Sequence, residues 1–123
     1  MKVIDASALA AVLFQEPEAH LIVGQVGDEP LVAPALLAYE IASTCWKKLK
    51  RHPEQRRELL AAHARLPHLG LRQAEVDLGE VVLLAERTGL TTYDATYLWL
   101  ARALDVELVS LDARLLRAAT ELG

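Results

Sequence analysis

The sequence predicts an α/β fold: a three-layer α/β/α sandwich whose central parallel sheet has four or five short strands. Three observations lead to this prediction. The chain has 123 residues, enough for one domain with a genuine core. Short β-type runs alternate with helical patterns from one end to the other. Strands separated by helices usually form a parallel sheet that is covered on both faces. We therefore expect a single domain over residues 1–123.

The first half of the chain is expected to contain two strands and four helices. Lys2–Asp5 and Leu31–Ala33 are short apolar runs typical of buried strands. Prolines stand where helices are expected to begin, because proline is well accommodated in a first helical turn. The predicted helices are Ala6–Phe14, one from Pro17 to Gly24 or Gly27, one from Pro34 to about Arg51, and one that begins at Pro53 and stops by Pro67.

The second half is expected to contain three helices and at least one strand. Leu71–Val76 fits a short strand and equally fits the approach to the next helix. Gly89 is a natural C-terminal cap, and Thr91 or Thr92 is a good N-cap for the helix that follows. The predicted elements are the helices Asp77–Thr88, Tyr93–Leu104 and Ala113–Leu122 and the strand Glu107–Ser110.

Composition narrows the class of protein. Hydrophobic residues make up 53% of the chain, which suits a compact soluble fold and argues against disorder. No apolar run approaches the roughly 20 residues of a membrane span, and no signal-peptide pattern is evident, so no membrane association is expected. Cys45, the single cysteine, lies in an apolar helical pattern and is expected to be a core residue in a reducing compartment. The expected location is the cytoplasm.

Charge is distributed unevenly along the chain. The formal net charge of −4 disfavours simple electrostatic binding to nucleic acid. Between Lys47 and Arg65, however, seven basic and two acidic residues give a net charge of +5, which leaves −9 for the remainder. The molecule is therefore expected to have a basic side and an acidic remainder.

Four acidic residues are expected to meet at one edge of the sheet. Asp5 ends the first strand, and Asp112 follows the last one in ELVSLD. Asp94 lies in the first turn of the helix in TTYDATYLWLA, and Glu40 lies early in the helix after the second strand. In open α/β sheets, ligands bind beyond the carboxyl ends of the strands. These acids are therefore candidates for a binding site.

Each acid also has a purely structural interpretation. Asp5 and Asp112 are equally well explained as helix N-caps, and Glu40 taken alone fits a solvated glutamate better. Asp94 is harder to explain in this way, because at helical spacing it shares an inward face with Tyr97. Together the carboxylates would repel one another unless a cation neutralised them, and oxygen ligands of this kind suit Mg²⁺ or Mn²⁺. No histidine or cysteine cluster indicates zinc.

An ordered set of motifs extends over nearly the whole chain: VIDASALAAVLF, PALLAYEIAS, AERTGLTTYDATYLWLARAL and LVSLDARLL. This set resembles the PIN-domain family, specifically the small stand-alone ribonuclease toxins of the VapC type. The residues matching the family's acidic quartet are Asp5, Glu40, Asp94 and Asp112. Ser7 and Ser110 match its small hydroxyl positions, which are expected to orient carboxylates or water, although helix capping and ordinary strand polarity explain them equally well. Family members often add a strand after the last helix, and no counterpart is evident before TELG.

The resemblance implies a PIN-like fold and hydrolysis of RNA phosphodiester bonds. It assigns one or two Mg²⁺ ions, or Mn²⁺, to Asp5, Asp94 and Asp112, with Glu40 acting directly or through water. It also implies an RNA substrate, a cognate antitoxin protein and a homodimer. The predicted helices in the first half of the chain carry more apolar residues than one sheet face can bury, which fits such partners. Packing of these residues within a monomer is the alternative.

A path for RNA is suggested by one helical face. Glu40, Ser43, Lys47 and Lys50 share this face, so the basic side is expected to begin beside the metal site. RNA phosphates would then follow Lys47, Lys50 and Arg51. An ordinary solvated basic face explains the same pattern equally well.

Other functions remain open at this point. The chain could be a housekeeping PIN-type RNA-processing nuclease or a PIN module that binds RNA or protein without cutting. A phosphoaspartate enzyme or a receiver domain would also use a strand-end aspartate with Mg²⁺. The former expects a second acid two residues after the first, where this chain has Ser7. A receiver expects a lysine on a late strand, and ELVSLD has none.

Overall fold

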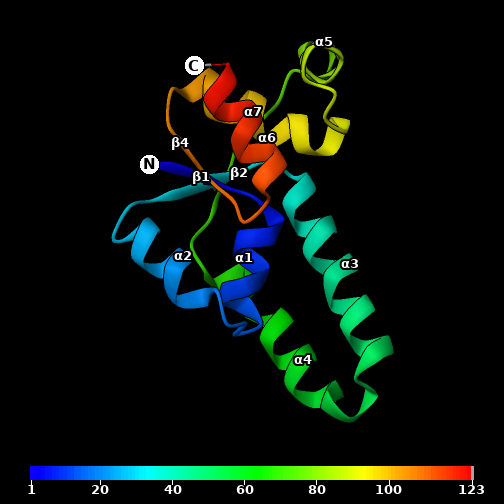
Figure 1. Ribbon diagram of the computed structural model, residues 1–123. Coiled ribbons are helices and arrows are strands. Elements are labelled where there is room, and N and C mark those ends of the chain that lie inside the picture. The colour runs from blue at the N-terminus through cyan, green and yellow to red at the C-terminus, as the bar shows by residue number, and fades with distance from the viewer. Residues whose placement is uncertain (123) are drawn as a thin grey trace.

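The computed structural model describes residues 1–122 and has helices on both faces of a four-stranded parallel sheet (Figure 1). The strands are β1 (Lys2–Ile4), β2 (Leu31–Ala33), β3 (Arg72–Gln73) and β4 (Glu107–Val109). The helices are α1 (Ala6–Leu13), α2 (Ala19–Val26), α3 (Leu36–Arg51), α4 (Arg56–Ala64), α5 (Leu78–Thr88), α6 (Thr92–Leu104) and α7 (Ala113–Glu121), with 3₁₀ turns η1 (Pro53–Gln55) and η2 (Leu66–His68). The predicted α/β/α sandwich with a parallel sheet is confirmed.

The sheet has the order β3-β2-β1-β4, so β1 lies inside it and pairs with β2 and β4. Val3 stands opposite Val32 on one side and Leu108 on the other. All three side chains are buried, because helices cover both faces of the sheet. This double burial explains why the strands appear in the sequence as continuous apolar runs rather than as alternating patterns.

Two groups of helices form the outer layers. In Figure 1, α5, α6 and α7 lie on one side of the sheet and α1 and α2 on the other, while α3 and α4 form a hairpin that extends away from it. Helix α6 packs against β1, β4, α5 and α7, and α1 packs against α2 and α3. The core includes Tyr97 and Leu98 from α6, Ile4 from β1 and Ile41 from α3, all fully buried.

Several predicted boundaries are wrong by one to three residues. Asp5 caps α1 rather than ending the strand, and Pro17 and Pro34 precede α2 and α3 instead of forming their first turns. The helix predicted from Pro53 to Pro67 is broken into η1, α4 and η2. It ends before Pro67 because proline has no N–H to continue the hydrogen-bonded ladder. The ambiguous segment after residue 70 contains the two-residue strand β3, which pairs with β2.

The turn between α5 and α6 follows the predicted capping pattern. Gly89 ends α5 in the left-handed conformation with φ of 74°, which glycine adopts without steric cost. Thr91 then caps α6 by accepting a hydrogen bond from the backbone N–H of Asp94, at 3.1 Å. The turn therefore places Asp94 in the first turn of α6, at the edge of the sheet.

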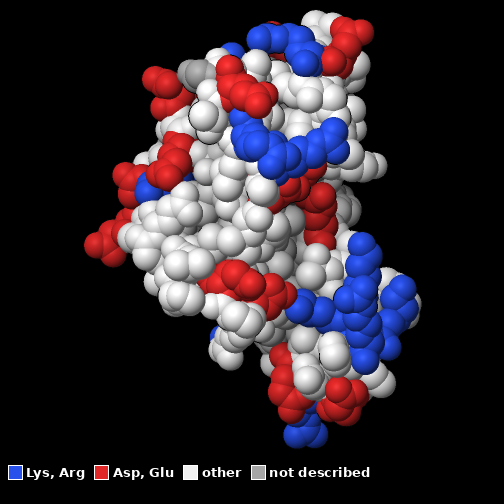
Figure 2. Space-filling model, in the orientation of Figure 1, with Lys and Arg blue, Asp and Glu red and all other residues white. Residues whose placement is uncertain are grey.

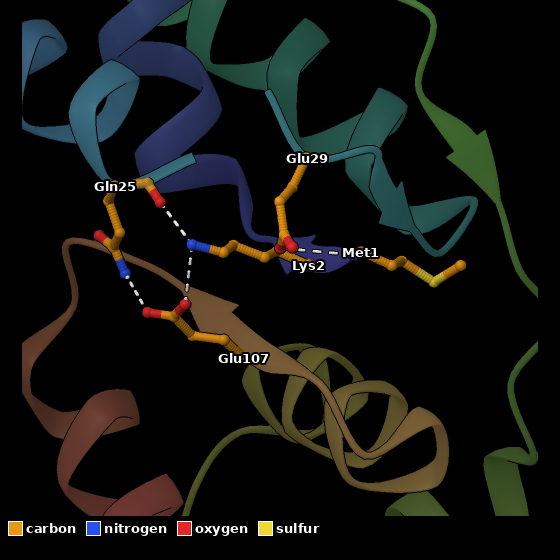
Figure 3. A network of polar contacts seen from close by, with 5 residues as sticks. All are labelled: Met1, Lys2, Gln25, Glu29 and Glu107. Carbon is orange, nitrogen blue, oxygen red and sulfur yellow. Dashed lines mark hydrogen bonds and ion pairs between the residues drawn. The ribbon is translucent and has the colours of Figure 1, made fainter. Parts of the chain in front are cut away.

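A polar network joins the opposite, amino-terminal edge of the sheet (Figure 3). The Lys2 ammonium contacts Glu107 at 3.0 Å and donates to the Gln25 carbonyl, while the Gln25 amide donates to Glu107 at 2.9 Å. These hydrogen bonds, that of Gln25 foremost, hold the pKa of Glu107 below its usual value. Because Glu107 is half-exposed, the pair contributes little to stability and chiefly ties α2 to β1 and β4.

Two expectations from composition can be compared with the structure. Cys45 is buried, and its thiol lies 3.8 Å from the Leu59 carbonyl oxygen, which joins α3 to α4. This confirms the prediction of a core cysteine. Within residues 1–122, none of the helices combines the length and the apolar character that crossing a membrane requires.

Candidate active site

A cleft of about 510 Å³ opens at the carboxyl edge of the sheet. All four predicted acids line it: Asp5, Glu40, Asp94 and Asp112. The other lining residues are Ala6, Ser7, Ala10, Glu16, Glu18, Ser43, Thr44, Lys47, Tyr97 and Leu111. The topology explains this gathering, because β1 and β4 are parallel neighbours whose ends meet at one edge, and α3 and α6 begin beside that edge.

Asp5 is the most constrained of the four acids. Its side chain is only 4% exposed and is held on three sides. One carboxylate oxygen accepts hydrogen bonds from the backbone N–H of Ala8 at 3.0 Å and from the Ser7 hydroxyl at 2.7 Å. The other accepts from the Ser110 hydroxyl at 2.5 Å. The orientation of this carboxylate is therefore fixed by the protein itself.

The two serine hydroxyls are themselves held by the loop that follows β4. The backbone N–H of Leu111 donates to Ser7, and that of Asp112 donates to Ser110, both at 2.9 Å. Each hydroxyl thus accepts one hydrogen bond from the backbone and donates one to the Asp5 carboxylate. The structure places both serines on the Asp5 carboxylate, so neither serves merely as a helix cap or as ordinary strand polarity.

Asp112 and Asp94 lie on either side of this network. Asp112 caps α7, because one of its carboxylate oxygens accepts from the backbone N–H groups of Arg114 at 2.9 Å and Leu115 at 3.2 Å. The capping interpretation is therefore correct for Asp5 and for Asp112. Asp94 has no such duty, because Thr91 caps α6, and its half-buried side chain lines the cleft.

Glu40 is not the freely solvated glutamate that its sequence position favoured. It is half-buried, and one of its carboxylate oxygens accepts a hydrogen bond from the Tyr97 hydroxyl at 2.5 Å. Tyr97 is 1% exposed, so its ring belongs to the core while its hydroxyl reaches the floor of the cleft. The pattern did indicate that Tyr97 faces inward with Asp94, but nothing in it pointed to Glu40.

Crowding of the carboxylates changes their acidity. Burial raises the pKa of Asp5, and the negative charge of Asp112 raises it further, against the lowering by its hydrogen bonds. Burial likewise raises the pKa of Asp94, and the charges of Asp112 and Asp5 add to that rise. The pKa of Glu40 is raised by burial and then by Asp94 and Asp5. The charges of Asp5, Asp94 and Asp112 therefore each raise the pKa of at least one other carboxyl group in the cleft.

The donor set fits a hard divalent cation. It consists of carboxylate oxygens, and along residues 1–122 none of the four acids forms an ion pair with a lysine or arginine. In the same range, no three acidic, histidine or cysteine side chains stand close enough together to make a ready-formed metal site. Asp5, Glu40 and Asp112 accept hydrogen bonds from protein donors instead. Binding a cation would draw the carboxylates together and relieve their repulsion.

A basic surface begins at the rim of the cleft. Figure 2 shows basic side chains gathered over α3, beside the acidic ones. Lys47 lines the cleft itself, and Arg51 is exposed one turn further along α3. Lys50 does not line the cleft, and its ammonium lies over the ring of Trp46, 5.1 Å from the ring centroid. Lys48 pairs with Glu16 at 2.6 Å and so is neutralised locally.

The comparison with protein families decides the relationship. The family model described as "PIN domain" matches residues 2–121. The chain belongs to the PIN-domain family. This confirms the resemblance that the four motifs indicated, and the matched residues include the whole of the carboxylate cleft.

Individual relatives fall within one branch of the PIN-domain family. Ribonuclease VapC9 of Mycobacterium tuberculosis is 38% identical over 120 residues, covering 94% of this chain and 88% of the relative. "VapC ribonuclease Mb0985" of Mycobacterium bovis matches to the same extent. Ribonuclease VapC3 of Pyrobaculum aerophilum is 32% identical over 118 residues, covering 92% and 90% of the two chains.

Solved structures share the fold of this PIN domain. PAE2754 from Pyrobaculum aerophilum superimposes with a TM-score of 0.69 at 29% identity, covering 95% of this chain and 84% of that one. VapC20 from Mycobacterium tuberculosis, described as a sarcin-ricin loop cleaving toxin, gives a TM-score of 0.66 at 17% identity, covering 96% and 95%. At that identity, the second comparison supports the fold alone.

Proposed function

We propose that this PIN domain is a divalent-metal-dependent endoribonuclease and the toxin of a toxin–antitoxin pair, acting in the cytoplasm. The observation that carries the proposal is the convergence of Asp5, Glu40, Asp94 and Asp112 on one cleft. Relatives that cover nearly the whole chain are VapC ribonucleases, which favours this activity over a housekeeping nuclease or a non-cutting module.

In this proposal, Asp5, Asp94 and Asp112 hold Mg²⁺, for which Mn²⁺ can substitute, and Glu40 faces the same space. When bound, the ion supplies positive charge that activates an attacking water and stabilises the charge developing on the phosphate. Ser7 and Ser110 keep Asp5 oriented by their hydrogen bonds. Tyr97 keeps Glu40 directed into the cleft. Ser7, Ser110 and Tyr97 thus position the carboxylates and need not touch the RNA.

The direct test is cleavage of RNA by the purified chain. Activity is expected with Mg²⁺ or Mn²⁺, none is expected with a chelator, and the new ends should be a 5′-phosphate and a 3′-hydroxyl. A preparation that binds RNA but never cuts it would favour the non-catalytic module. A toxin can be distinguished from a housekeeping enzyme by testing whether the protein product of a neighbouring small gene inhibits the cleavage.

Removing the Tyr97 hydroxyl tests its positioning role. In the folded protein, the hydrogen bond from Tyr97 lowers the pKa of Glu40. Tyr97→Phe removes this hydrogen bond, so the pKa of Glu40 should rise further. We expect kcat to fall about tenfold with little change in KM, and the acidic limb of the pH–rate profile to move to higher pH. The free energy of unfolding should fall by about 1 kcal/mol, measured in denaturant. A pH–rate profile identical to that of the parent enzyme would rule out this role.

The RNA path is proposed to leave the cleft along Lys47, Lys50 and Arg51. Replacing Lys47 and Lys50 together by alanine should weaken RNA binding and flatten its salt dependence. The expected loss of slope is about 0.7 per lost phosphate contact in a plot of log affinity against log salt concentration. Arg72→Ala with Arg87→Ala removes the same charge from other exposed positions and serves as the control. If both pairs have equal effects, the path lies elsewhere.

A second copy is proposed to cover an apolar surface near the start of α6. A cavity of about 600 Å³ lies there, lined by residues that include Leu36, Tyr39, Leu78 and Tyr93. Tyr39 is 76% exposed, Leu78 67% and Tyr93 61%. Apolar surface concentrated in this way is costly in water and marks an interface. A strict monomer in sedimentation at tens of micromolar would exclude the dimer.

The antitoxin is proposed to dock a helix between α1 and α4. A groove of about 330 Å³ lies between them, and its lining includes Leu13, Phe14, Leu59 and Ala62. The apolar face of an amphipathic helix fits a groove of this kind. A true antitoxin should co-purify with the chain after co-expression and suppress metal-dependent cleavage. Failure of both would leave a nuclease without this partner.

A further inference from the structure

The two tryptophans of the chain have different environments. Trp99 is partly buried, and its indole N–H donates to Glu80 at 2.9 Å, joining α6 to α5. Trp46 is 59% exposed on α3, and among the hydrogen bonds described for residues 1–122 its indole N–H has no acceptor. Trp99 therefore has a structural role that is satisfied within the fold. Trp46 presents a large aromatic surface to solvent.

The position of Trp46 relates it to the cleft. Residues three or four apart are neighbours on the surface of a helix. Ser43 lines the cleft, and one turn further along α3 stand Trp46 and Lys47, of which Lys47 also lines it. Lys50 follows by one more turn, with its ammonium 5.1 Å from the centroid of the Trp46 ring. Trp46 is not itself a lining residue of the cleft, but its indole contacts Lys50, one of the lysines proposed to bind phosphates.

We infer that Trp46 is a stacking platform for the base of an unpaired nucleotide, next to the segment of RNA that enters the cleft. This inference rests on the proposed ribonuclease function. Aromatic side chains beside a basic track bind single strands, because every base offers a flat face while the cations hold its phosphates. Lys50 covers one region of the ring, and the exposed remainder is available to a base. The lysines supply charge, and the indole supplies a contact that charge alone does not.

The inference predicts which form of RNA depends on Trp46. A base inside a double helix is already stacked on both faces and cannot reach Trp46 without being extruded. Trp46 should therefore contribute to binding where a nucleotide beside the scissile phosphate is unpaired, and not within a duplex. Phosphate contacts alone do not create this preference, because they are present in single strands and duplexes alike.

The test compares binding of a short mixed-sequence single-stranded RNA with binding of its duplex. Asp94→Asn in Mg²⁺ serves as the parent, so that the probe is not consumed. Adding Trp46→Ala should weaken single-strand binding roughly 5- to 100-fold and leave duplex binding nearly unchanged. Trp46→Phe in the same parent should retain most of the single-strand affinity that Trp46→Ala loses. The salt slope should stay the same in Trp46→Ala, in contrast to the double lysine variant.

A second readout uses the indole directly. With Trp99→Phe as background, emission comes from Trp46, and it should be quenched by the single strand and not by the duplex. Replacing the bases of the probe one at a time by abasic sites should identify one position whose loss weakens binding to the parent but not to Trp46→Ala. That position is the base stacked on the indole.

Two results would overturn the inference. One is that Trp46→Ala cleaves and binds single-stranded RNA as well as the corresponding parents do. This result would refute the role of Trp46 in stacking without contradicting the proposed ribonuclease function. The other is a shift from dimer to monomer in Trp46→Ala with unchanged RNA binding, which would assign the indole to a protein interface. If the unmodified chain neither binds nor cuts RNA, the proposed function fails, and the inference fails with it.

Discussion

In Asp94→Asn, the rate of metal-dependent RNA cleavage is expected to fall by at least about 100-fold, while the fold is kept. Among the aspartates of the cleft, Asp94 gives the cleanest test. Asp5 and Asp112 also cap helices, so changing them alters the backbone as well as the site. Asp94 lies in the first turn of α6, which Thr91 already caps. Only the charge and ligand capacity of the cleft should therefore change.

The same variant should be more stable than the parent in the absence of metal. Burial raises the pKa of Asp94, and the charges of Asp112 and Asp5 raise it further, so the ionised form is disfavoured in the folded state. Removing that charge should increase the melting temperature by a few degrees. Asp28→Asn, at an exposed position away from the cleft, is the matched control and should change neither property. Undiminished cleavage by Asp94→Asn would contradict the assignment.

A large increase in thermal stability is expected when Mg²⁺ or Mn²⁺ is added at neutral pH. A ligand that binds only the folded state stabilises it by about 2.7 kcal/mol when present at 100 times its dissociation constant, which corresponds to several degrees. The gain should be markedly smaller in Asp94→Asn, because that variant lacks one ligand. Sodium chloride at equal ionic strength is the control, since screening alone weakens repulsion between charges. An equal effect of both salts would argue against specific binding.

Acidification should mimic the metal over a limited range. Burial is the main cause that raises the pKa values of Asp5, Glu40 and Asp94, so the folded state binds protons more readily than the unfolded chain. Stability of the metal-free protein should therefore increase as the pH falls from neutral toward the ordinary carboxyl pKa values of about 4, and the gain should be lost as the pH rises again. Plots of melting temperature against pH, measured with and without Mg²⁺, should converge at acidic pH. If the two plots stay parallel, these acids do not bind the ion.

The fold could be predicted because local and global signals agree. Apolar runs such as Val3–Ile4 and the capping residues Gly89 and Thr91 each indicated the element that forms. The strand β3 could not be assigned, because a two-residue strand at the edge of a sheet has no period to detect. The end of α4 before Pro67 could be predicted, because proline cannot continue the hydrogen-bonded ladder, whereas the 3₁₀ turns η1 and η2 were not predicted.

The acidic part of the site could also be predicted, since chain topology alone brings strand ends together. What the pattern did not contain was the partner of each carboxylate. Tyr97 and Glu40 are 57 positions apart, and only the crossing of α6 over the sheet joins them. The contact of Lys50 with the ring of Trp46 is likewise a choice of rotamer that helical spacing does not encode. Glu16 and Glu18 join the cleft through the turn between α1 and α2, which no periodicity describes.

The hydrogen bonds that hold Asp5 join residues at opposite ends of the chain. Ser110 donates to Asp5 across 105 positions, and Leu111 donates to Ser7 across 104. During synthesis, Asp5 therefore leaves the ribosome long before Ser110 can hold the second oxygen of its carboxylate. A nascent chain should remain inert until β4 has emerged and paired with β1. Both oxygens of the Asp5 carboxylate should thus be held only after almost the entire chain has been synthesised.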